Sequence, residues 1–233
     1  MSLRYPDDLP LRDDLREGHA AAWADIGNPG VAWTGAERVA IVAEARAALD
    51  CSLCNDRKSA LSPYAVNGAH DAASDLPAPV VDGIHRLRTD PQRLTRAWFD
   101  SLVPEYLSQS AYVELVSVVC TSVIVDTEHN ALGLPVPTVP DAADGEPGGE
   151  LLDDTVDIGA WLPVVKTEAD LADTGLPTVP NIARAMSLVP SAAALFFVAF
   201  RPHYRLQQLH LAVTQAQAEF IASRVSALNQ CFY

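Results

Sequence analysis

A stretch of 22 residues with no glycine or proline limits most strongly what this chain can fold into. It reads AYVELVSVVCTSVIVDTEHNAL over residues 111–132, with Ser110 before it as a start signal and Gly133 after it as a stop. Many of its residues are β-branched, but its length is that of a helix and not of a strand. Because it is apolar on nearly every face, we expect a central, buried helix.

Two capping boxes predict further helices. Thr34 stands three residues before Glu37, and the alanine-rich sequence behind it predicts a helix as far as Asp50. Thr214 and Gln217 repeat the pattern before a C-terminal helix. On that helix, four apolar residues share one face: Phe220, Ile221, Val225 and Leu228.

Shorter helices are expected between these three. They cover CSLCNDRKSAL from Cys51, then residues 80–87, 92–102 and 181–188, and the apolar LFFVAF at 195–200. No segment predicts a convincing strand. The expected fold class is therefore all-α, a bundle of about eight helices.

The chain divides by composition into four parts. Residues 1–33 are polar and read as an N-terminal arm, and residues 34–133 form a helical half that contains the central helix. Residues 134–181 are a proline- and glycine-rich connection, and residues 182–233 form a C-terminal helical half. Residues 37–51 faintly echo residues 219–231, since each is a helix that starts at glutamate and runs into a cysteine, which suggests an internal repeat.

Charge excludes several classes of partner. The net charge of −14 argues against binding to nucleic acid and to anionic membrane surfaces. The first residues lack the apolar core of a signal peptide. The most apolar stretch, residues 111–125, is short for a bilayer and contains Glu114. We therefore expect a cytoplasmic protein.

The cysteines point to thiol chemistry. There are only four, too few for a disulfide scaffold, and Cys51 and Cys54 form a C-x-x-C pair. At the start of a helix the backbone amides favour a thiolate, which is the nucleophilic form. The plainer interpretation is a pair of small core residues. A zinc site is not expected, because there is no second C-x-x-C and no H-x3-H pair. We expect no cofactor.

Three segments carry a resemblance to a known family. The C-terminal EFIASRVSALNQCFY, the central AYVELVSVV with ALGLP after it, and EARAALDCSLCNDRKSALSP resemble the alkylhydroperoxidase AhpD-like family of the carboxymuconolactone decarboxylase-like superfamily. One branch of that family includes selenoproteins. The resemblance touches most of the chain, although only the C-terminal motif is mechanistically specific.

The resemblance implies a thiol- or selenol-dependent peroxidase. By this match Glu219 belongs to the proton relay and Cys231 is the first cysteine of the redox motif. The peroxide-attacking residue would be number 234, after Tyr233, so the motif is incomplete in this sequence. Three explanations stay open: missing residues, truncation, or a selenocysteine codon read as a stop. The implied partners are a peroxide, a thiol electron donor and further copies of the chain in a homo-oligomer.

The N-terminal pair departs from the family pattern. Lys58 stands where the family has histidine, and Val39 stands where it has glutamate, so Glu44 is the candidate substitute. Cys51 and Cys54 are then a second redox centre, a relay or a remnant.

Two residues of the central helix complete the candidate site. Glu114 has apolar neighbours and must find a partner or shift its pKa, and His129 could join Glu114 and Glu219 in a proton relay. His129 could also simply complement the helix dipole. The alternative from another class is a non-catalytic helical protein whose Cys51 and Cys54 are structural or redox-sensing. A third possible function, that of a lyase of the same superfamily, would not need a C-x-x-C pair, so the thiols count against it.

Overall fold

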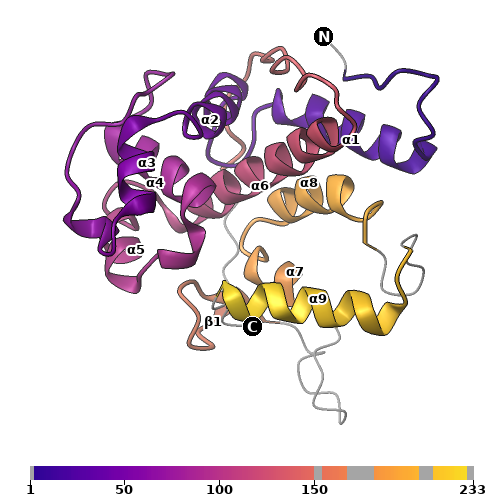
Figure 1. Ribbon diagram of the computed structural model, residues 1–233. Coiled ribbons are helices and arrows are strands. Elements are labelled where there is room, and N and C mark those ends of the chain that lie inside the picture. Colours follow the sequence, from indigo (N-terminus) through magenta and orange to yellow (C-terminus); the bar gives the residue numbers. More distant parts are fainter. Residues whose placement is uncertain (1–2, 150–153, 167–180, 205–211, 230–233) are drawn as a thin grey trace.

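The long apolar stretch forms the central helix of the protein. The computed structural model describes residues 3–149, 154–166, 181–204 and 212–229. Helix α6 (Gln109–Ala131) begins at Ser108, whose side chain accepts a hydrogen bond from the amide of Ala111. It is contacted by helices α1, α2, α4 and α8, so it is covered on several sides as expected (Figure 1).

The described residues are mostly helical. The other α-helices are α1 (Asp13–Ile26), α2 (Gly35–Ala47), α3 (Ser52–Ser59), α4 (Ala78–Thr89), α5 (Arg96–Leu102), α7 (Asn181–Ala185), α8 (Pro190–Phe200) and α9 (Gln215–Leu228). Two single 3₁₀ turns, Pro63–Ala65 and Pro91–Arg93, lie between α3 and α4 and between α4 and α5. Helix α3 packs against α4, and α1 and α8 pack against each other as well as against α6.

Both predicted capping boxes are confirmed. The Thr34 side chain accepts from the amide of Glu37, whose carboxylate accepts from the Thr34 amide in return. Thr214 and Gln217 make the same reciprocal pair at the start of α9. These local hydrogen bonds satisfy amides that a helix start leaves without partners, which is why the pattern could be read from sequence.

Two expectations about elements are corrected. Residues 1–33 are not only an arm, because α1 lies within them and buries Leu15, Trp23 and Ile26. The connection at 134–181 contains two short strands, β1 (Thr155–Val156) and β2 (Val164–Val165), paired antiparallel. Strands of two residues are too short to show an alternating pattern, so the sequence could not predict them.

Helix α6 is longer than the sequence argument about membranes assumed. At 23 residues it is long and apolar enough to cross a bilayer by length and composition, and 67% of its apolar window is buried inside the fold. Core helices of soluble proteins share both properties. The expectation that this stretch is too short for a bilayer is therefore wrong for α6 as a whole.

The apolar face of α9 is not buried in the single chain. Among the side chains described for this helix, only Ala218 is buried. Phe220 is 72% exposed, and the three residues that share its face are about half exposed, namely Ile221, Val225 and Leu228. The predicted amphipathic helix exists, but the rest of the described chain does not cover its apolar face.

Candidate functional site

Two cysteines and two histidines meet at the start of α3. The sulfur or ring-nitrogen atoms of Cys51, Cys54, His70 and His85 all lie within 4.8 Å of one another. His70 Nδ1 is 3.5 Å from Cys51 Sγ and 3.6 Å from Cys54 Sγ, and His85 Nδ1 is 3.3 Å from Cys54 Sγ. Both cysteines are free thiols. The C-x-x-C pair is thus part of a four-residue cluster, which we call the Cys/His cluster, in which His70 is partly buried and the other three residues are buried.

Three elements bring the Cys/His cluster together. Cys51 is the N-cap residue of α3 and Cys54 lies in its first turn, so both sulfurs face the same side. His70 lies in the loop after the first 3₁₀ turn, and His85 lies on the buried face of α4. The loop is held against α3 because the Asp71 carboxylate accepts from the amide and hydroxyl of Ser52, each at 2.7 Å.

A buried carboxylate orients His85. The Glu44 carboxylate from α2 lies 3.0 Å from His85 Nε2, and neither side chain is exposed. Glu44 also accepts from the Ala73 amide at 2.8 Å and the Ser74 hydroxyl at 2.6 Å. With its Nε2–H donated to Glu44, neutral His85 presents the lone pair of Nδ1 to Cys54. Glu44, His85 and Cys54 therefore form a line of carboxylate, imidazole and thiol.

A second carboxylate orients His70. Asp82 Oδ1 on α4 lies 3.0 Å from His70 Nε2 and 2.6 Å from Arg57 Nη1. The other oxygen of Asp82 accepts from Arg86 at 2.9 Å and from the Trp98 ring at 3.2 Å. Each histidine of the cluster thus directs Nδ1 toward sulfur and Nε2 toward a carboxylate.

The surroundings favour a thiolate at Cys51. Burial raises the pKa of the Cys51 thiol, but hydrogen bonds from the backbone of Asp71 and of Cys54 and from His70 outweigh it, so this pKa lies below its usual value. Burial lowers the pKa of His70, but hydrogen bonds to Asp82 and to the two thiols raise it to about 10. Without a bound metal, His70 is therefore an imidazolium, and its hydrogen bond favours the thiolate form of Cys51.

In the pair of His85 and Glu44, the histidine is neutral and the carboxylate carries the charge. Burial lowers the pKa of His85 and outweighs its hydrogen bond to Glu44. Burial also raises the pKa of Glu44, but hydrogen bonds from Ser74, His85 and Ala73 outweigh that and leave it below its usual value. A charged Glu44 beside a neutral His85 makes His85 a base that can take a proton from Cys54.

Three members of this arrangement were not foreseen from sequence as site residues, namely His70, His85 and Asp82. A zinc site was not expected because the sequence has no second closely spaced pair of ligands, whereas the structure supplies one histidine from a loop and another from a helix 15 positions later. The one available signal was a histidine among the apolar residues Val80, Val81 and Ile84. Glu44, by contrast, was the expected substitute for the missing glutamate, and it contacts the histidine beside Cys54.

Glu114 stabilises a backbone turn. Its carboxylate accepts from the amides of Val31 at 3.0 Å and Ala32 at 2.8 Å, and Arg38 Nε lies 3.5 Å away. Burial raises the pKa of Glu114 more than these amides and Arg38 lower it. Glu114 and His129 are 15 residues apart on α6, about 22 Å along the axis, so they share no proton directly.

The remaining sequence candidates lie elsewhere. Glu219 on α9 accepts a hydrogen bond from the Tyr204 hydroxyl at 2.6 Å. Cys231 lies outside the described residues. Cys120 on α6 is partly buried, and burial raises its pKa to about 11, so it is a poor nucleophile.

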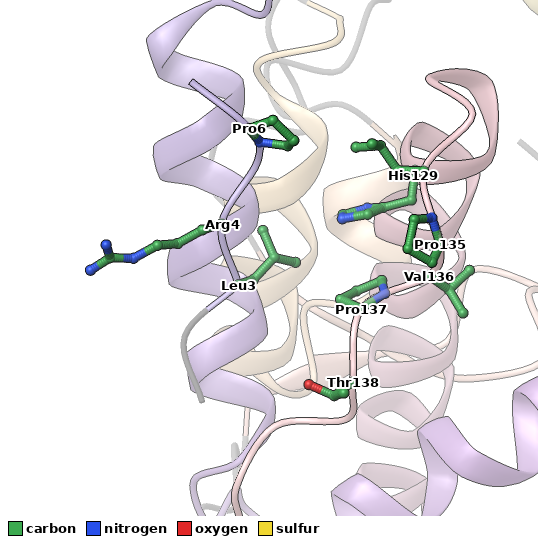
Figure 2. Close-up of a pocket in the computed structure, with 9 residues that line it drawn as sticks. Leu3, Arg4, Pro6, His129, Pro135, Val136, Pro137 and Thr138 are labelled. Carbon is green, nitrogen blue, oxygen red and sulfur yellow. The ribbon is translucent and has the colours of Figure 1, made fainter. Parts of the chain in front are cut away.

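His129 lies at the wall of a separate pocket. This pocket has a volume of about 360 Å³ and lies between residues 3–6 and residues 134–138, with His129 pointing into it (Figure 2). No member of the Cys/His cluster lines it. His129 Nδ1 lies 2.9 Å from the Val125 carbonyl, and its ring lies 4.6 Å from that of Tyr5. It is thus not brought to the thiols.

Three hydrogen-bonded side chains beside this pocket make the free energy of unfolding depend on pH. His19 is fully buried, with Nδ1 2.6 Å from the Tyr5 hydroxyl and Nε2 2.8 Å from His203 Nε2. Burial, followed by the neighbouring His203 and His129, lowers its pKa to about 4. An unfolded histidine has a pKa of about 6.5, so between these values the unfolded chain binds more protons.

We therefore expect the free energy of unfolding to fall as the pH drops from about 6.5 to about 4, with His19 contributing about 3 kcal/mol. Urea unfolding across this range should show a smaller slope in His19→Gln. Glu17→Gln, an exposed neighbour on α1, is the control and should keep the full slope. Equal slopes in both variants would contradict the role of His19.

The comparisons with protein-family models, with curated proteins and with solved structures find no match for this chain. The fold and the Cys/His cluster define a mostly helical protein with a buried dithiol and a set of side chains that could hold a metal ion.

Proposed function

We propose that this chain is a cytoplasmic, thiol-dependent redox protein of the AhpD-like type that reduces a peroxide at Cys51 and Cys54. The observation that carries the proposal is the line from Glu44 through His85 to Cys54, with hydrogen-bond distances of 3.0 and 3.3 Å. A nucleophile beside a base, with the base oriented by a third group, is the general arrangement of an activated nucleophile.

The proposed cycle transfers two electrons. His85 takes the proton of Cys54, and the thiolate attacks the outer oxygen of a hydroperoxide. The O–O bond breaks, His85 returns the proton to the departing alkoxide, and the products are a sulfenic acid on Cys54 and an alcohol. The Cys51 thiolate then attacks the Cys54 sulfur and forms a disulfide, and the expelled hydroxide takes a proton from the His70 imidazolium and leaves as water. Two thiols of an external donor reduce this disulfide and are themselves oxidised.

The surroundings of the cluster favour this proposal over an inert pair of cysteines. Small core residues need no buried charge nearby, yet the fold buries the Glu44 carboxylate next to His85 at 0% exposure. A buried charge is costly unless it is paired and hydrogen-bonded, and His85 Nε2 is one of the groups that pair with the Glu44 carboxylate. The exposed apolar face of α9 supports the expected homo-oligomer.

The test is peroxide-driven disulfide formation in the reduced, metal-free protein, followed by mass spectrometry and thiol counting. We expect a Cys51–Cys54 disulfide, and the reaction rate with peroxide should fall at least about 100-fold in Cys54→Ser and also in His85→Gln. Cys120→Ser is the matched control and should react like the unaltered chain. Equal loss of thiols in Cys54→Ser and Cys120→Ser would rule out the proposed centre.

A further inference from the structure

The Cys/His cluster has the ligand set of a closed zinc site. Two thiolates and two imidazoles are a common donor set of structural zinc centres, which bind the ion with four protein ligands in a tetrahedron. The cluster offers one ligand atom from each of its four residues, all within 4.8 Å of one another, and three of the four residues are buried. Tetrahedral sites made of two sulfurs and two nitrogens are typical of zinc.

The distances match those between ligands around a zinc ion. With Zn–S near 2.3 Å and Zn–N near 2.0–2.1 Å, a tetrahedral angle puts sulfur and nitrogen ligands about 3.6 Å apart. Three of the four sulfur–nitrogen distances here are 3.5, 3.6 and 3.3 Å, and the fourth is within 4.8 Å. A pair of thiols packed only as core residues has no reason to meet two ring nitrogens at this spacing.

The outer contacts of both histidines also match a metal site. A histidine that binds zinc usually donates its other ring N–H to a carboxylate or carbonyl, which fixes the tautomer and orients the ring. His85 Nε2 lies 3.0 Å from Glu44, and His70 Nε2 lies 3.0 Å from Asp82. Both histidines therefore present Nδ1 toward the same point.

We propose that Cys51, Cys54, His70 and His85 bind one Zn²⁺ ion, which ties α3, the following loop and α4 together. All four positions of the tetrahedron are filled by protein, so the bound ion has no open site for substrate. This inference goes beyond the proposed function and does not rest on it.

Zinc binding and peroxide reduction would be alternative states of the same thiols. In the zinc form both sulfurs are bound thiolates. A hydroperoxide that oxidises them takes up two electrons and two protons and becomes an alcohol and water, while the two sulfurs form a disulfide and Zn²⁺ is released. We therefore expect the metal-bound protein to react with peroxide more slowly than the metal-free protein.

The experiment is elemental analysis of the full chain purified under reducing conditions without chelator, together with titration of the metal-free chain with Zn²⁺. We expect one zinc per chain, and at least a tenfold weaker affinity in Cys51→Ser, Cys54→Ser, His70→Ala and His85→Ala. Cys120→Ser and His203→Gln are the controls and should bind like the unaltered chain. Substitution with Co²⁺ should give the thiolate charge-transfer and d–d absorption of a tetrahedral site.

Variants that keep a ligand separate loss of metal from loss of folding. His70→Cys and His85→Cys replace one zinc ligand by another, so each should still bind one zinc even where the alanine variant does not fold. Failure of the reduced, folded chain to bind zinc would overturn the proposal, and so would unchanged affinity in both histidine-to-alanine variants.

The two proposals fail separately. Zinc binding without peroxide-driven disulfide formation in the metal-free chain leaves the metal site and removes the redox function. Disulfide formation in a chain that does not bind zinc leaves the redox function and removes the metal site.

Discussion

Replacing Asp82 with alanine is expected to lower the free energy of unfolding by about 3 kcal/mol, as for other partly buried charged groups that lose a partner. Asp82 joins four side chains: it contacts His70, Arg57 and Arg86 and accepts from the Trp98 ring. Burial raises the pKa of its carboxyl, but His70 and the two arginines hold it well below its usual range. Its removal takes away one acceptor from each of two arginines, from His70 and from an indole N–H.

The matched control for Asp82→Ala is Asp100→Ala. Asp100 pairs with Arg96 at 2.7 Å, but the two side chains are 53% and 56% exposed. Exposed pairs of this kind contribute about 0.5 kcal/mol or less. Urea unfolding of both variants checks the contrast, and equal losses would show that the Asp82 network does not stabilise the fold. Asp82→Ala should also weaken zinc binding by about 10- to 100-fold, because His70 loses its orienting partner.

Sequence predicted the elements whose signals are local. The starts of α2 and α9 depend on hydrogen bonds between residues three apart, and the 22-residue apolar stretch could hardly be anything but a buried helix. Helix α1 was missed because its first residues are acidic and its apolar positions are filled largely by alanine. Its burial depends on α6 and α8, which are distant in sequence.

Only the two cysteines of the Cys/His cluster could be predicted from the sequence. The spacing of Cys51 and Cys54 places both on one turn of α3, which is a local property. The positions of His70 and His85 depend on the path of the loop between α3 and α4, and contacts such as the Ala73 amide to Glu44 fix that path. These contacts join residues 29 positions apart, so no pattern in the sequence could reveal them.

For Glu114 and His129 the structure shows contacts other than those of the expected proton relay. An acid in an apolar stretch is a reasonable site candidate, because such groups often have shifted pKa values. Here the acid accepts from two backbone amides of a turn, which is an equally good reason to bury it. From sequence alone the two reasons look the same, because the turn lies more than 80 residues before Glu114.

Gly30→Ala provides the second large effect and tests the role of Glu114 directly. A Cβ atom added at Gly30 would lie 1.6 Å from Glu114 Oε1, far inside contact distance. The carboxylate has little room to move, because it is buried and bound to the amides of Val31 and Ala32. We expect Gly30→Ala to lower the free energy of unfolding by about 3 kcal/mol, at the upper end for overpacked cores.

Two further variants identify the cause of that loss. Gly148→Ala adds the same methyl group, but its Cβ would meet nothing nearer than the Gly30 carbonyl at 3.7 Å, so it should change stability by less than about 0.5 kcal/mol. In a Glu114→Ala background the clash is absent, and adding Gly30→Ala should cost less than about 1 kcal/mol. Chemical denaturation of the two single variants and the double variant gives the coupling energy. If Gly30→Ala lowered the free energy of unfolding equally with and without the Glu114 side chain, a clash with the Glu114 carboxylate would not be the cause of the loss.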